Sequence, residues 1–161
     1  MNRTRLSFCL QVSLYPYVMK ALPFPVGNPR VITRETLLQE GGPPLPWRAP
    51  QPYRGLLLVR VLPPLGARAL RVPLLPYRTR DGRLAFPLCA RCADNCQQRA
   101  CRHTDRQRSW TAAYTHAELN RALELGYLVI DVFEVGNLGW AKNSMMMWIF
   151  AHTHVPTGVA L

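Results

Sequence analysis

The apolar positions of the chain are concentrated in a few short segments separated by turn residues. Gly55–Val61 is an apolar run with a single arginine in it, which predicts a buried strand. Leu70–Leu75 predicts a second strand at a sheet edge, because Pro73 lacks the backbone N–H that an interior strand needs. Asp81–Gly82 predicts a hairpin turn, with Leu84–Phe86 as the returning strand.

A helical pattern follows in the last third of the chain. Thr115 and Glu118 have the spacing of a capping box, and three apolar residues then recur on one helical face: Leu119, Ala122 and Leu123. Gly126 lies where such a helix would end. The β-branched and aromatic residues of Tyr127–Val135 predict a strand after it. Helix and strands together predict an α+β fold.

Proline limits the helical content of the first half of the chain. Fourteen of the 15 prolines lie between Pro16 and Pro87, where they remove backbone donors and clash with a preceding helical turn. Leu22–Pro29 predicts a turn-rich connection and Glu40–Pro52 a loop. The apolar run Met145–Ala151 is too short to cross a bilayer, so no membrane partner is expected.

The net charge of +11 is concentrated in the middle of the chain. Between Arg48 and Arg108 there are 13 arginines, no lysine and three acidic residues. A positive field of this kind favours binding to phosphate backbones or anionic membranes, and nucleic acid is the favoured partner. The alternative is a solvated basic face that binds nothing in particular.

Four of the five cysteines lie close together, and a histidine follows them. The spacing Cys89-x2-Cys92 and Cys101-x-His103 suits a tetrahedral, structural Zn²⁺ site. Cys96 is a fifth candidate that could replace one of these ligands. A redox-labile thiol cluster and a disulfide pair are the alternatives to a metal site.

A short motif near the N-terminus adds a resemblance to a known family. Residues 13–20, SLYPYVMK, resemble motif A (D-x-x-S-L-Y-P) of protein-primed family B DNA polymerases, and are very close to the Polinton/Maverick transposon version. The resemblance implies that Ser13, Leu14 and Tyr15 bind the incoming nucleotide, with Tyr15 against the deoxyribose. The family's Mg²⁺-binding aspartate would stand at position 10, where this chain has Leu10. Mg²⁺ is therefore expected only in the intact family enzyme.

Further short motifs follow the transposon polymerase pattern in order between residues 62 and 135, among them LPP, LLPYR, GRL, FPLC and C-x-H. The resemblance implies that residues 48–135 form an insertion that contacts the primer–template duplex and a terminal protein. Zinc would there fold a small knuckle. The arginines expected to face DNA phosphates are Arg60, Arg71, Arg78, Arg80 and Arg83.

Three regions are expected: residues 1–47, a motif A palm segment with a Pro-rich linker; residues 48–135, the basic insertion; and residues 136–161, an aberrant tail. The overall expectation is an irregular, Pro-rich α+β fragment of a DNA-directed DNA polymerase, with a partial palm segment and a strand–helix–strand insertion that carries the zinc knuckle. No catalysis is expected from the chain itself, because the family's second aspartate motif, exonuclease carboxylates and fingers helix are also absent. The alternative is a free-standing zinc-binding, nucleic-acid-binding module with its own core.

Overall fold

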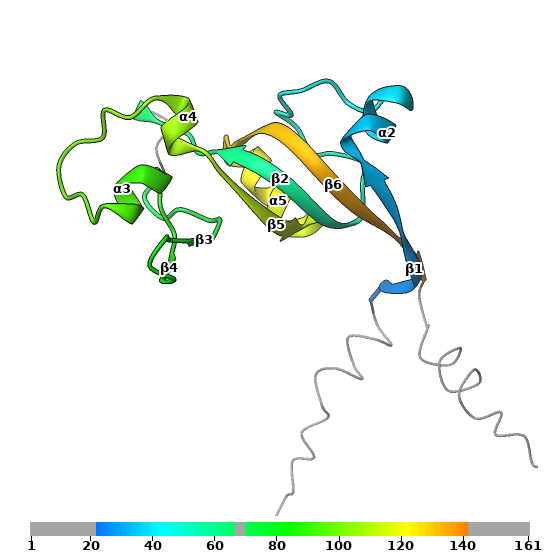
Figure 1. The fold of residues 1–161 in the computed structure, drawn as a ribbon. Helices are drawn as coiled ribbons and strands as arrows, with labels where there is room; N and C mark the ends of the chain where they lie inside the picture. The colour runs from blue at the N-terminus through cyan, green and yellow to red at the C-terminus, as the bar shows by residue number, and fades with distance from the viewer. Residues whose placement is uncertain (1–21, 67–69, 142–161) are drawn as a thin grey trace, which may run out of the picture. The chain divides into compact units, whose positions relative to one another are not determined.

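The computed structural model describes residues 22–66 and 70–141, in which four strands form an antiparallel sheet with the order β1-β6-β2-β5 (Figure 1). These strands are β1 (Phe24–Thr33), β2 (Gly55–Leu62), β5 (Trp110–Thr115) and β6 (Leu128–Ala141). A separate hairpin joins β3 (Tyr77–Arg78) to β4 (Leu84–Ala85). The described helices are α2 (Arg34–Gln39), α3 (Ala90–Asp94), α4 (Asp105–Arg108) and α5 (His116–Glu124). The fold is therefore mixed α+β, as expected.

Residues Asn28–Leu138 form one compact unit, which contains the four described helices and the hairpin. The outer ends of β1 and β6 belong to a second unit, most of which lies outside the described ranges. Within the described residues, no helix has the length and apolar character needed to cross a membrane.

The core lies between one face of the sheet and α5. Alternate residues of β2 point into it, so Leu57 is fully buried while its neighbours Leu56 and Leu58 are 58% and 37% exposed. The buried residues that surround Leu57 come from β2, α5 and β6: Val59, Val61, Leu119, Ala122, Leu123, Val129, Val132 and Val135. The predicted strand at Gly55–Val61 is confirmed, and it is the central strand that pairs with both β5 and β6.

The predicted helix is also confirmed. Thr115 caps α5, and its Oγ1 accepts the backbone N–H of Glu118 while the Glu118 carboxylate accepts the backbone N–H of Thr115. Gly126 has a positive φ of 90°, which allows the chain to leave the helix and enter β6. The strand expected over Tyr127–Val135 forms as β6 and continues to Ala141.

Two assignments made from the sequence, one of a strand and one of a connection, are wrong. Leu70–Leu75 forms no strand, and one of its backbone donors is bonded to a side chain: the N–H of Leu74 donates to the hydroxyl of Tyr127. Leu22–Pro29, expected to be a connection, contains the first half of β1. β1 lies at a sheet edge. Proline is tolerated on an edge strand, because the backbone N–H that it lacks would face solvent and not a neighbouring strand.

β5 also went unrecognised as a strand. β5 lies between the cysteine-rich segment and α5, and its side chains Trp110 and Tyr114 are buried on the core face. The hairpin turn expected at Asp81–Gly82 is confirmed: Gly82 has a φ of 86°, and Tyr77 pairs with Ala85 across the hairpin. The loop expected over Glu40–Pro52 contains no helix or strand apart from an isolated bridge between Trp47 and Val129.

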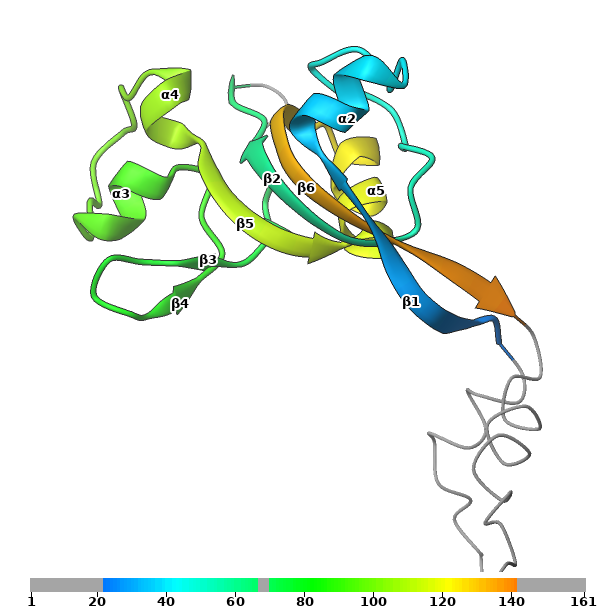
Figure 2. The ribbon, with the colours of Figure 1, turned by 45° about the vertical axis from the view of Figure 1, so that its right-hand side comes forward.

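The elements next to the cysteines gather at one end of the sheet. In both views, α3, α4 and the β3–β4 hairpin lie together beyond the same end of β2 and β5, away from α5 (Figures 1 and 2). We call residues 87–108 the Cys/His segment. It connects the hairpin to β5 and therefore begins and ends on structured elements.

Candidate metal centre

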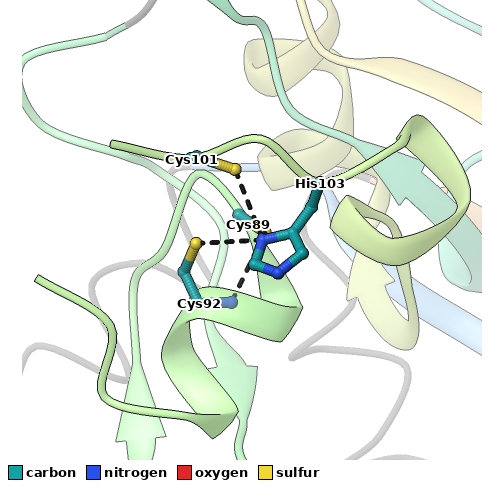
Figure 3. Close-up of side chains that lie close together, drawn as sticks. All are labelled: Cys89, Cys92, Cys101 and His103. Atoms are coloured by element: carbon teal, nitrogen blue, oxygen red, sulfur yellow. Dashed lines mark hydrogen bonds between the residues drawn. The ribbon is translucent and has the colours of Figure 1, made fainter. Parts of the chain in front are cut away.

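Four potential metal ligands meet inside the Cys/His segment. The sulfurs of Cys89, Cys92 and Cys101 and a ring nitrogen of His103 all lie within 4.8 Å of one another (Figure 3). These are the four residues that the sequence spacing predicted as ligands. Cys89 is buried and the other three are partly buried, so the group is sheltered from solvent.

The distances fit a four-coordinate ion. His103 Nδ1 lies 3.5 Å from Cys89 Sγ, 3.3 Å from Cys92 Sγ and 3.6 Å from Cys101 Sγ. A tetrahedral ion with a metal–sulfur bond of about 2.3 Å and a metal–nitrogen bond of about 2.0–2.1 Å places sulfur and nitrogen about 3.5 Å apart. The His103 nitrogen therefore stands at one corner of a tetrahedron whose other corners are the three sulfurs.

The first two cysteines are arranged by a helix start. Cys89 is the N-cap of α3, and its sulfur accepts the backbone N–H of Cys92 at 3.4 Å. This capping contact holds the two side chains on the same side of the first turn. The spacing C-x-x-C is the one that such a turn requires, which is why the sequence alone could indicate it.

The other two ligands come from an extended stretch. Cys101 and His103 are two residues apart before α4, so their side chains point the same way. The N–H of Thr104 donates to the side chain of Gln107 at 3.0 Å and begins the helix immediately after His103. Figure 3 shows this stretch facing α3 across the cluster.

The thiols differ in their acidity. Burial raises the pKa of Cys89, and burial together with the two neighbouring thiols raises the pKa of Cys92 to about 12. Burial acts in the same direction on Cys101, but hydrogen bonds from the backbone and ring of His103, together with those from the thiols of Cys92 and Cys89, outweigh it and lower the pKa of Cys101 to about 7. A cation bound here would have to displace protons from Cys89 and Cys92.

Two polar anchors tie the segment to the rest of the unit. The carboxylate of Asp94 is only 7% exposed and accepts the hydroxyl of Tyr77 at 3.0 Å and the backbone N–H of Arg80 at 3.2 Å. The ring of Tyr77 in turn packs against Trp110 of β5, with 5.4 Å between ring centroids. Asp94 therefore connects α3 to the sheet through one tyrosine.

The second anchor is Arg108, the last residue of α4. Its guanidinium is buried, and it donates to the carbonyls of Pro63 at 2.7 Å and Pro64 at 3.3 Å, just beyond β2. Sequence reasoning did not single out Arg108 or Asp94. Arg108 is one of 13 arginines in its region, and no pattern distinguishes the one that folds inward.

Cys96 lies apart from the cluster. It is exposed, has a positive φ of 50°, and its sulfur accepts a hydrogen bond from Arg83 at 3.0 Å. The four cysteines of the described chain are free thiols. The structure therefore contains no disulfide among these four cysteines, in contrast to the alternative considered from the sequence.

The five arginines predicted to contact DNA lie in different surroundings. Arg60 is on β2, with its guanidinium 5.7 Å from the centre of the Phe133 ring. Arg78, Arg80 and Arg83 are exposed on and around the hairpin, and each has a local partner: the Gly82 carbonyl, Asp94 and Asp81, respectively. Arg71 is exposed in the connection between β2 and β3. The structure thus brings three of the five together.

The residues predicted to bind the nucleotide, Ser13, Leu14 and Tyr15, lie outside the described residues, as does Leu10. No family model, curated protein or solved structure matches the chain, so a functional proposal rests on its own sequence and geometry.

Proposed function

We propose that the chain is a zinc-stabilised nucleic-acid-binding module. The observation that carries this proposal is the closed set of four protein ligands, Cys89, Cys92, Cys101 and His103, within an arginine-rich segment. A catalytic zinc site keeps one position open for water or substrate, whereas a structural site is filled by protein. The ion would serve to fold the segment.

Zinc is the metal that this ligand set favours. Three thiolates and an imidazole are soft to intermediate donors, and a sulfur-rich tetrahedral site selects Zn²⁺ over Mg²⁺ or Ca²⁺, which prefer oxygen ligands. Metal analysis of purified protein tests this. We expect about one zinc per chain, removed by a strong chelator and restored by added Zn²⁺, and protein without any bound zinc would refute the assignment.

Nucleic acid is the partner that the charge favours. The arginine-rich region from Arg48 to Arg108 contains the Cys/His segment, which itself carries five of the 13 arginines. Phosphate contacts release counterions, so the affinity should fall steeply with salt. Binding of a labelled duplex measured at several KCl concentrations tests this, and an affinity that does not change with salt would refute phosphate recognition.

The motif order favours a more specific origin for this module, as part of a protein-primed family B DNA polymerase. SLYPYVMK and the ordered short motifs between residues 62 and 135 support this proposal. Because the motif A aspartate is Leu10 here, the chain should incorporate no nucleotide. Leu10→Asp should not restore incorporation, since a second metal-binding carboxylate motif is also needed. Nucleotide incorporation by either protein would contradict this part of the proposal.

A further inference from the structure

A hollow of about 500 Å³ lies beside the metal ligands, within the loop that joins α3 to α4. It is lined by Gln97, Arg99, Ala100, Arg102 and His103. Two of these residues carry guanidinium groups, and no acidic residue takes part. The hollow is therefore a concave, positively charged surface built from a single short loop.

The two arginines differ from those of the hairpin. Arg78, Arg80 and Arg83 bond to a carbonyl or a carboxylate nearby. Within residues 22–66 and 70–141, the guanidiniums of Arg99 and Arg102 form neither an ion pair nor a hydrogen bond. Both residues are exposed, so their donors are available to an anion.

His103 contributes a third donor. Its Nδ1 faces the three sulfurs, and its second ring nitrogen points away from them (Figure 3). A histidine that ligates a metal through Nδ1 keeps its proton on Nε2, which then donates a hydrogen bond. Metal binding would hold this ring as a donor in a fixed orientation.

The conformation of the loop between α3 and α4 is held by the metal ligands at its two ends and by hydrogen bonds inside it. Cys92 and Cys101 flank it, so a shared metal ion would pin its two ends. Inside it, the backbone N–H of Gln97 donates to the Cys92 carbonyl at 2.9 Å, and the Gln97 side chain donates to the carbonyls of Arg99 and Ala100 at 3.4 and 3.3 Å. Gln97 thereby holds the backbone between the two arginines.

We propose that Arg99, Arg102 and His103 form a binding site for one phosphate group of a nucleic acid backbone, and that metal binding at the cluster assembles this site. The proposal rests on the proposed function and deepens it, because it locates the phosphate contact on the metal-bound loop and not on the hairpin arginines. Guanidinium groups match phosphate oxygens in geometry as well as charge.

The experiment compares zinc-loaded wild type with two double variants that lose the same charge. Arg99→Gln/Arg102→Gln removes the hollow's cations, and Arg78→Gln/Arg83→Gln removes two hairpin cations. Binding of a labelled 20-base-pair duplex is measured from about 0.05 to 0.2 M KCl. We expect the first variant to lose at least about tenfold in affinity, with a log–log salt slope shallower by about 0.9, as for the loss of one phosphate contact, and the second to stay within about threefold of wild type.

Arg99→Lys/Arg102→Lys separates charge from a structural role, because it should keep the wild-type slope while the glutamine variant does not. The zinc content of all variants should remain about one, since the substituted side chains are exposed and are not ligands. Equal losses in both glutamine variants, or no loss in the Arg99/Arg102 variant, would overturn the site while leaving nucleic-acid binding intact.

A second arm uses inorganic phosphate as the probe. In zinc-loaded protein, phosphate should shift the NMR amide signals of residues 99–103, and the shifts should disappear after chelation of the metal. If phosphate shifts these signals but the duplex does not bind, the assignment to a backbone phosphate is overturned together with the proposed function. If the duplex binds and these signals do not respond to it, only the site is wrong.

Discussion

The two halves of the compact unit are held together by different forces. In the sheet–helix half, β2, β6 and α5 bury a continuous set of aliphatic side chains against one another. In the Cys/His segment, the buried residues are Cys89, Ala90 and Arg108, so much less apolar surface is removed from water there. Folding must overcome about 1–2 kcal/mol of backbone entropy per residue, and apolar burial offsets much more of this in the first half.

The Cys/His segment therefore needs another source of order. The structure offers the four-ligand cluster, the Asp94 anchor and the Arg108 anchor. Regions with few buried apolar contacts unfold locally at lower free energy than the core. The two halves should therefore respond separately to changes that remove ligands and changes that remove apolar volume.

The largest effect is expected from removing a ligand. Cys92→Ser should abolish zinc binding, because the free energy of a structural site is shared by all four ligands. Amides of residues 87–108 should then lose protection from hydrogen exchange, while those of β2 and β6 keep theirs. Metal analysis and hydrogen-exchange mass spectrometry provide the two measurements.

Cys96→Ser is the matched control, since its sulfur lies outside the cluster. It should keep about one zinc per chain and normal protection. If Cys92→Ser unfolded β2 and β6 as completely as the Cys/His segment, the separation between the halves would not hold.

Core truncation should act on the other half. Leu57→Ala leaves a cavity under the sheet and should lower the free energy of unfolding by about 2–5 kcal/mol, measured by urea denaturation followed through tryptophan fluorescence. The neighbouring residue Leu58 is 37% exposed, so Leu58→Ala should lower the free energy of unfolding by less than about 1 kcal/mol. Equal losses from the two variants would mean that β2 does not present alternate faces as described.

Arg108 joins the halves, so its removal tests the connection. Arg108→Met keeps most of the side-chain volume but leaves the carbonyls of Pro63 and Pro64 without their donor. We expect a loss of about 1–3 kcal/mol in the free energy of unfolding. Arg106→Met, on an exposed position of the same helix, should stay within about 0.5 kcal/mol of wild type.

The smallest effect concerns the start of α5. Thr115→Ala removes the oxygen that accepts the N–H of Glu118 and should lower the free energy of unfolding by about 1 kcal/mol. Thr115→Ser retains that oxygen and should change it by only a few tenths of a kcal/mol. A serine variant as unstable as the alanine variant would show that the methyl group, and not the cap, matters here.

Elements with strong local signals were predictable from the sequence. The capping box, the apolar face of α5 and the apolar run of β2 each depend on only a few neighbouring residues. β5 was missed because Trp110–Thr115 contains threonine and alanine between its two aromatic residues, and its strand conformation depends on pairing with β2, about 50 positions away. Leu70–Leu75 has the composition of a strand, but Tyr127 takes one of its backbone donors.

The sequence alone determined which residue types could bind a metal and at what spacing, because a helical turn brings positions 89 and 92 together and an extended chain does the same for 101 and 103. It favoured these four residues but left Cys96 open as a replacement for one of them. Only the tertiary structure turned Cys96 toward Arg83 and the other four toward one another. In the same way, composition determined that the region is basic, but only folding decided which guanidinium is buried beneath Pro63 and which remain exposed. The physical reason is that spacing constrains neighbours along the chain, whereas burial and pairing depend on segments distant in sequence.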